Sequence, residues 1–224
     1  MLDLALRPIK DRWLTPVADR VAGTVRADAI TAIGLVAGLA AAGAAATGWR
    51  WASVVLWLAG RTVDGLDGLV ARRRGEASDL GGYLDMLADT IAYAAIPIGL
   101  AWAAGGAGAW AATAVLLGAF YLNTVSWAYL SALLEKRGDG VAAAGEATSI
   151  RMPPALVEGT ETIVFYTVFL ALPQHLVVLF PVMAALVVVG VGQRWRWARR
   201  ALRHPPAAPS RPRHDAKPLI MEER

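Results

Sequence analysis

The sequence predicts an all-α, polytopic membrane protein with six transmembrane helices and an N-terminal interfacial amphipathic helix. Three observations lead to this fold class. Hydrophobic residues make up 56% of the 224 residues, several apolar runs reach the roughly 20 residues that a helix needs to cross a bilayer, and these runs are continuous and rich in Ala, Leu and Val. Only helices and closed barrels can satisfy all of their backbone hydrogen bonds inside lipid. A barrel would need alternating strands of about 10 residues, so the continuous runs favour helices.

Residues 1–26 are predicted to form an amphipathic helix in the membrane interface. Leucine, tryptophan and valine are mixed there with five basic residues, Arg7, Lys10, Arg12, Arg20 and Arg26. This mixture is typical of helices that lie on a membrane surface. An ordinary solvated leader is the alternative. The segment lacks the short apolar core of a cleavable signal peptide.

Six apolar segments follow and form one predicted transmembrane domain, residues 27–194. They cover approximately residues 29–47, 52–71, 80–103, 109–134, 156–172 and 176–191. We expect Asp79, which precedes the third segment, to cap its helix. Residues 195–224 are basic and then rich in proline, which is typical of a cytoplasmic tail without fixed structure.

The distribution of basic residues predicts the orientation in the membrane. All Lys and Arg except Arg50 and Arg61 fall in the N-terminal segment, in the loops after the second and fourth spans, or in the tail. By the positive-inside rule, both termini and these loops face the cytoplasm of a cell (inner) membrane. The net charge of +4 then follows from this bias and from attraction to anionic lipid, and it needs no nucleic-acid partner. The chain has no Cys, which excludes disulfides and thiolate sites.

Four acidic residues lie inside predicted spans, where each costs about 2.5–3.5 kcal/mol at the bilayer centre. Asp64 and Asp67 are three residues apart in the second span, and Asp85 and Asp89 are four apart in the third. Each pair therefore shares one helix face, and a helical hairpin would bring the four carboxylates together near the cytoplasmic side. Salt bridges to Arg61 and Arg72 are the alternative, but they account for two acids at most.

A cluster of four carboxylates predicts a site for divalent cations. Unmetallated, some of the four would have to take up protons. Mg²⁺ and Mn²⁺ prefer oxygen ligands and often bridge substrate phosphates, so two such ions could clamp a diphosphate and stabilise displacement at phosphorus. The nearby glycines leave room for a ligand or, alternatively, for close helix packing; they are Gly65, Gly68, Gly81 and Gly82.

These residues form the pattern D-x-x-D-G-x-x-A-R, then eight residues, then G-x-x-x-D-x-x-x-D. The fixed positions are Asp64, Asp67, Gly68, Ala71, Arg72, Gly81, Asp85 and Asp89. The pattern closely resembles the motif of the CDP-alcohol phosphotransferase (phosphatidyltransferase) family, and all eight positions match its spacing. With the six predicted spans, the resemblance covers about residues 20–195.

The resemblance implies an enzyme of phospholipid biosynthesis that moves a phosphoalcohol group from a CDP-linked donor, in bacteria usually CDP-diacylglycerol, to an acceptor alcohol and releases CMP. It further implies that Asp64, Asp67 and Asp85 hold the two Mg²⁺ or Mn²⁺ ions and that Asp89 completes the set and acts as general base. Four further positions would shape the nucleotide pocket, Gly68, Ala71, Arg72 and Gly81. Members of the family commonly form homodimers.

One departure from the family pattern lies upstream. Many members carry a Pro-Asn-x-x-Thr-like stretch before the first span, and this chain has Asp28 in place of the Asn and keeps Thr31. Thr31 is therefore a candidate for nucleotide contact, whereas Asp28 suits a helix cap.

The acceptor alcohol must be recognised outside this motif. The fifth span opens with Glu158 and Glu161 in the sequence E-G-T-E-T, preceded by Arg151; this stretch resembles a little-characterised bacterial branch of the family. One hypothesis is that these residues receive a cationic or polyhydroxyl acceptor. The alternative is that the acids stabilise a helix N-terminus or pair with Arg151.

Two other functional classes compete with the transferase. A membrane prenyltransferase also holds a diphosphate with Asp-rich helices and Mg²⁺, but it lacks the G-x-x-A-R element that Gly68, Ala71 and Arg72 provide. A non-enzymatic cation-binding protein or transporter also carries intramembrane acids and predicts metal flux, whereas the transferase predicts CMP release.

Overall fold

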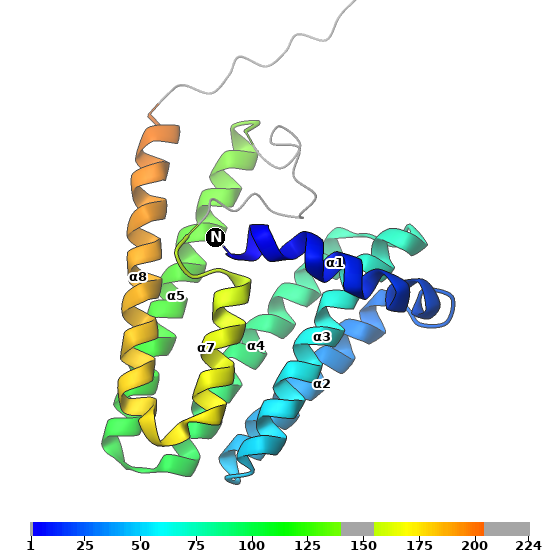
Figure 1. Cartoon of the computed structure of the whole chain (residues 1–224). Helices are drawn as coiled ribbons and strands as arrows, with labels where there is room; N and C mark the ends of the chain where they lie inside the picture. The colour runs from blue at the N-terminus through cyan, green and yellow to red at the C-terminus, as the bar shows by residue number, and fades with distance from the viewer. Residues whose placement is uncertain (1, 140–154, 204–224) are drawn as a thin grey trace, which may run out of the picture.

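A computed structural model of the chain describes residues 2–139 and 155–203, and in these ranges the only regular structure is helical (Figure 1). The helices are α1 (Leu2–Val21), α2 (Ala27–Ala46), α3 (Arg50–Arg74), α4 (Asp79–Ala104), α5 (Gly106–Lys136), α7 (Gly159–Ala171), the short 3₁₀ helix η1 (Pro173–His175) and α8 (Leu176–Ala201). The long helices run along one another, and α1 lies across one end of the bundle. The predicted all-α fold class is confirmed.

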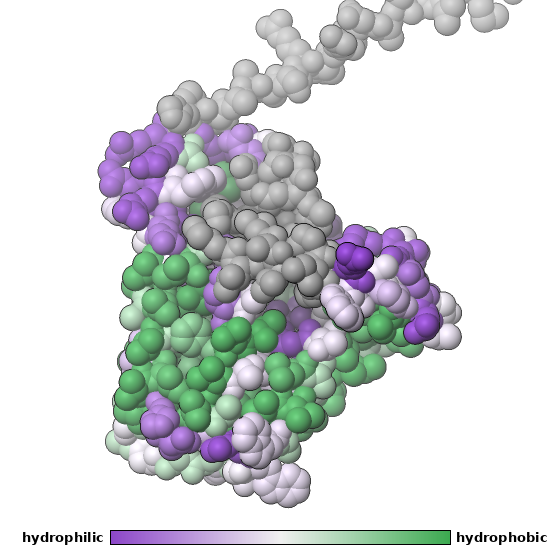
Figure 2. Space-filling model, viewed as in Figure 1, coloured by the Kyte–Doolittle hydropathy of each residue, from purple (hydrophilic) through white to green (hydrophobic). Residues whose placement is uncertain are grey.

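Within the described residues, four helical segments are long and apolar enough to cross a membrane: α2, α4, α5 and Pro173–Ala201. Figure 2 shows the corresponding hydrophobic band over the body of the bundle, with hydrophilic side chains gathered towards its ends. The two remaining predicted spans have other properties. Helix α3 has 25 residues but carries several charges, and α7 has only 13 residues. Six spans therefore stay a prediction.

Helix α1 is attached to the bundle through the end of α3. Arg73 forms an ion pair with Asp19 and donates a hydrogen bond to the Thr15 carbonyl oxygen at 3.2 Å. Arg74 donates to the Ala22 carbonyl oxygen at 2.6 Å. Two of the three consecutive arginines thus hold α1 across the bundle end, although its place in a membrane interface stays a prediction.

Small residues bring α2 into close contact with α3 and α4. A Cβ atom placed on Gly38 would lie 2.9 Å from the Ala92 Cβ, and one placed on Gly60 would lie 3.2 Å from the Ala37 Cβ. A Cβ on Gly99 would collide with the backbone carbonyl of Ala42. Glycines outside the acidic motif thus allow close helix approach.

Large aromatic side chains fill the space around α7. Tyr166 and Phe169 of α7 are fully buried, and the Tyr166 ring packs against those of Trp57 and Tyr93 at centroid distances of 5.3 and 5.2 Å. The Tyr166 hydroxyl donates to the Tyr93 carbonyl oxygen at 2.6 Å. α7 is thereby fixed against both α3 and α4.

Two details differ from the sequence-based expectations. Ser78, not Asp79, caps α4, because its hydroxyl accepts a hydrogen bond from the Gly81 N–H. Helix α8 continues through Ala201, into the segment predicted as an unstructured tail. Arg, Trp and Ala all tolerate a helix, and no proline lies between Pro181 and Pro205. Residues from 204 onward lie outside the described ranges.

Candidate metal centre

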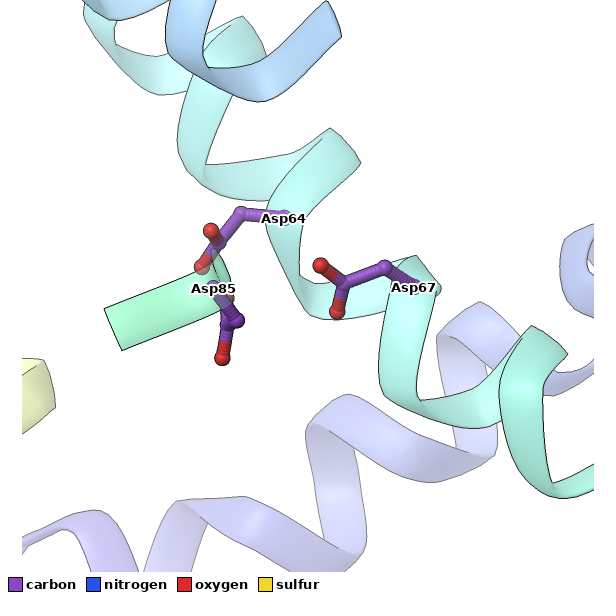
Figure 3. Close-up of side chains that lie close together, drawn as sticks. All are labelled: Asp64, Asp67 and Asp85. Carbon is purple, nitrogen blue, oxygen red and sulfur yellow. The ribbon is translucent and has the colours of Figure 1, made fainter. Parts of the chain in front are cut away.

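Three carboxylates converge between α3 and α4. Asp64 and Asp67 project from successive turns of α3, and Asp85 projects from α4 towards them (Figure 3). One oxygen of each lies within 4.8 Å of the others. The i,i+3 spacing places the first two on one helix face, and the turn at Gly75, whose φ of +65° favours glycine, returns the chain so that α4 can supply the third.

Two hydrogen bonds orient Asp67, the most buried of the three carboxylates. Asp67 is buried, with 9% of its surface exposed. Its Oδ2 accepts a hydrogen bond from the Thr31 hydroxyl at 2.7 Å, and its Oδ1 accepts one from the Gly68 N–H at 2.6 Å. Thr31 therefore reaches the site as an outer partner of a carboxylate, a role that sequence reasoning missed when it considered Thr31 only for nucleotide contact.

Asp89 is linked to the site through a buried arginine. Arg61 of α3 forms ion pairs with Asp64, at 3.4 Å, and with Asp89. The group of three converging carboxylates does not include Asp89. The salt-bridge interpretation thus applies to Asp64 and Asp89, both of which pair with Arg61.

The remaining motif residues lie around the turn between α3 and α4. Arg72 is exposed, and a Cβ atom on Gly68 would lie 3.4 Å from its Nη1. The absence of a side chain at Gly68 thus leaves room for the guanidinium. Gly81 donates its N–H to Ser78 at 3.2 Å, and Ala71 is half-buried in the last turn of α3.

The predicted acceptor residues lie at the start of α7. Glu158 and Glu161 form a reciprocal capping box, in which the Glu158 side chain accepts from the Glu161 N–H and the Glu161 side chain accepts from the Glu158 N–H. Glu161 is the third residue of α7, and its carboxylate helps to cap the first turn of the helix. The helix-terminus alternative is the one observed. Arg151 lies outside the described residues.

Arg194 on α8 is a buried cation that sequence reasoning assigned to the edge of the basic tail. It is 3% exposed, and its Nη1 donates to the Asn123 Oδ1 of α5 at 2.9 Å. One turn earlier, a Cβ atom on Gly190 would lie 3.3 Å from the Ala155 Cβ, so α8 closely approaches the start of α7. No local sequence pattern predicts this pairing, since 71 positions separate Arg194 from Asn123.

The donor set fits a hard divalent cation. Carboxylate oxygens are the ligands that Mg²⁺ and Mn²⁺ prefer, and three of them within 4.8 Å can share one ion. Carboxylates that are themselves hydrogen-bonded hold their orientation better, as the two bonds to Asp67 show. Such a centre suits reactions in which negative charge develops on phosphate oxygens.

Comparison with known proteins identifies a family match over most of the chain. Residues 24–193 match the family described as CDP-alcohol phosphatidyltransferase. This range contains α2 to the middle of α8 and every residue of the acidic motif.

Two relatives share 38% of their residues with the chain over part of its length. One is the inner membrane protein YnjF of Escherichia coli, over 144 residues that make up 62% of this chain and 66% of that protein. The other is the archaetidylinositol phosphate synthase of Methanothermobacter thermautotrophicus, over 94 residues that make up 42% and 47%. The chain thus spans just under two thirds and about half of these relatives. The name of the first agrees with the apolar helices of this chain.

Solved structures share the fold at low sequence identity. The Mycobacterium tuberculosis phosphatidylinositol phosphate synthase with CDP-DAG bound has a TM-score of 0.65 at 23% identity, with 84% of this chain and 94% of that chain covered. The same enzyme in complex with manganese and citrate has a TM-score of 0.64 at 23% identity, with 83% and 88% covered.

Proposed function

Because the chain belongs to the CDP-alcohol phosphatidyltransferase family, we propose that it transfers a phosphatidyl group from CDP-diacylglycerol, or a similar CDP-alcohol, to an acceptor alcohol with release of CMP. The product would enter phospholipid biosynthesis. The observation that carries this proposal is the convergence of Asp64, Asp67 and Asp85, which are motif residues of a family whose chemistry takes place at a diphosphate.

The metal centre is proposed to hold two divalent cations, Mg²⁺ or Mn²⁺. Asp64, Asp67 and Asp85 would supply the oxygen ligands, and Asp89 would complete the set from one turn further along α4. When bound, the ions neutralise charge on the diphosphate and on the departing CMP. The Thr31 hydroxyl and the Gly68 N–H keep Asp67 oriented during this exchange of charge.

The cytidine diphosphate is proposed to lie over the turn between α3 and α4. Gly68, Ala71 and Gly81 offer a surface with little side-chain bulk there. The exposed guanidinium of Arg72 can donate to phosphate oxygens in a bidentate manner, while its neighbours Arg73 and Arg74 are engaged with α1. Thr31 is proposed to support this site indirectly, through its hydrogen bond to Asp67.

Asp89 is proposed as the general base. The acceptor hydroxyl attacks the β-phosphorus of the donor, the bond between that phosphorus and the CMP oxygen breaks, and the hydroxyl proton passes to the Asp89 carboxylate. A carboxylate can take this proton late, when P–O bond formation has acidified the hydroxyl. Asp89 lies on α4 one turn after Asp85, between the metal ligands and Tyr93.

The acceptor is proposed to bind near the N-terminal end of α7, at Arg151, Glu158 and Glu161. Capping of α7 explains both glutamates structurally, so a direct test is needed. Glu161→Gln should raise the acceptor KM if Glu161 binds the acceptor. If it only caps the helix, the variant should lose stability at unchanged KM.

The chain is proposed to be a homodimer of the inner membrane, with both termini and the site on the cytoplasmic side. The ends of α3, α5 and α8, which carry basic residues, lie at the same end of the bundle as α1 (Figure 1). Since the chain has no Cys, single cysteines introduced at Glu76 and Gly48 can be labelled with an impermeant reagent in spheroplasts. Only Gly48→Cys should react before lysis.

The transferase assignment is tested directly with purified protein. Labelled CDP-diacylglycerol, Mn²⁺ and a panel of alcohols should give CMP and one new lipid, which mass spectrometry identifies. Chelation of the metal should stop both. Metal flux into proteoliposomes without CMP release would instead indicate a transporter, and turnover of a prenyl diphosphate would indicate a prenyltransferase.

A further inference from the structure

Arg61 is a buried cation in the wall of the acidic site. The residue is 8% exposed, and its guanidinium carbon lies 5.0 Å from the ring centre of Trp57 and 5.4 Å from that of Tyr93. The same guanidinium pairs with Asp64 and Asp89. Aromatic faces and carboxylates together thus fix it in place.

Asp64 links this arginine to the metal centre. One Asp64 carboxylate takes part both in the three-acid group and in the ion pair with Arg61. Any cation that binds to the three acids therefore shares a ligand with the guanidinium. Asp89, outside that group, has Arg61 as its cationic partner.

The charges of the site decide how many divalent ions it holds at rest. Four carboxylates and one guanidinium carry a formal charge of minus three. One divalent ion leaves minus one, whereas a second ion would leave this partly buried site positive, where like charges repel more strongly than in bulk water. The negative charge of the donor's diphosphate would neutralise this excess positive charge.

We propose that Arg61 is a positioning residue that takes the place of a second cation, holding Asp64 and Asp89 so that the second divalent ion binds only together with the diphosphate. This inference rests on the proposed function of the same site. Under this proposal, the two divalent ions bind in separate steps. The first ion binds at Asp64, Asp67 and Asp85, and the second competes with the guanidinium once the donor has arrived.

The consequence for catalysis is control over Asp89. While Arg61 holds the Asp89 carboxylate in an ion pair, that carboxylate is engaged and does not face an acceptor hydroxyl, so the general base is held back until the donor is bound. The arrangement would limit futile hydrolysis, since water and acceptor meet an active base only beside a bound diphosphate.

The test counts Mn²⁺ ions on the purified protein by electron paramagnetic resonance, with and without CDP as the diphosphate. Wild type should bind one ion without CDP and two with it. Arg61→Gln and Arg61→Met remove the charge, and Met retains much of the stem that packs on the rings. Both variants should bind two ions without CDP, the second at least roughly tenfold more tightly than in wild type. Arg61→Lys keeps the charge and should behave as wild type.

The outcomes separate this inference from the proposed function. Two ions on wild type without CDP, or one ion on both neutral variants without CDP, would overturn the role of Arg61 and leave the transferase intact. Failure of wild type to bind Mn²⁺ under any of these conditions would overturn the metal centre itself. Thermal unfolding of each variant confirms that the ions are counted on folded protein, and either neutral variant suffices for the test.

Discussion

The half of the molecule built from α2, α3 and α4 differs sharply from the half built from α5, α7 and α8. In the first, small residues such as Gly38 and Gly99 let the helices approach closely, and the acids of the site lie within one helical hairpin. In the second, large rings such as Tyr166, Phe169 and Phe180 fill the core, and the polar contact between Arg194 and Asn123 joins distant segments.

The difference follows the proposed division between the two substrates. The first half holds the residues proposed for the donor, which a short continuous motif specifies. The start of α7, in the second half, holds Glu158 and Glu161, which are proposed for the acceptor and lie outside that motif. Relatives can therefore share donor chemistry while their acceptors differ, and the predictions below test this division.

The largest effect is expected at the centre of the first half. Asp67→Ala removes a buried carboxylate ligand, so CMP release from CDP-diacylglycerol should fall by at least about a thousandfold, since a metal ion stabilises several kcal/mol of developing charge. Asp79→Asn is the matched control, because Asp79 begins α4 outside the cluster. Equal activity of the two variants would contradict the metal assignment.

A large loss of stability is expected where α2 and α4 touch. Gly99→Ala places a Cβ against the Ala42 backbone carbonyl, and because backbone cannot rotate away, unfolding in detergent should become easier by about 3 kcal/mol. The control is Gly43→Ala, which has open space within 4 Å and should stabilise α2 by up to about 1 kcal/mol. A neutral Gly99→Ala would mean that this half is loosely packed.

A smaller effect is expected outside the ligand set. Thr31→Val removes the hydroxyl that donates to Asp67 at 2.7 Å and keeps the shape of the side chain. Loss of such an outer partner typically costs about 10–100-fold in metal affinity or activity. A titration of activity against Mn²⁺ should therefore shift to higher metal concentrations. If only the CDP-diacylglycerol KM changes, Thr31 contacts the nucleotide instead.

The smallest effect is expected in the aromatic core of the second half. Tyr166→Phe removes the hydrogen bond to the Tyr93 carbonyl oxygen and should lower the free energy of unfolding by about 1 kcal/mol. Its Mn²⁺ binding should equal that of wild type, because the ring packing is retained. A change in metal affinity would show that the two halves are coupled through Tyr93.

Much of the first half could be predicted from the sequence because its information is local. Asp64 and Asp67 share a helix face by their spacing alone. The short connection between α3 and α4 then places Asp85 beside them. The predicted cap at Asp79 was wrong because a hydroxyl one residue earlier reaches the Gly81 N–H. At Glu161 the structure adds a capping box at the start of α7, and the role of this residue in acceptor binding stays a prediction.

By itself, the sequence determined the all-helical class, the apolar segments and the family motif, since composition and spacing along one helix suffice for each. Only the tertiary structure decided which groups surround those acids. It placed Thr31 on Asp67, Arg61 between Asp64 and Asp89, and Arg194 against Asn123. Contacts between helices depend on how side chains pack across the bundle, and no periodicity within one helix records that.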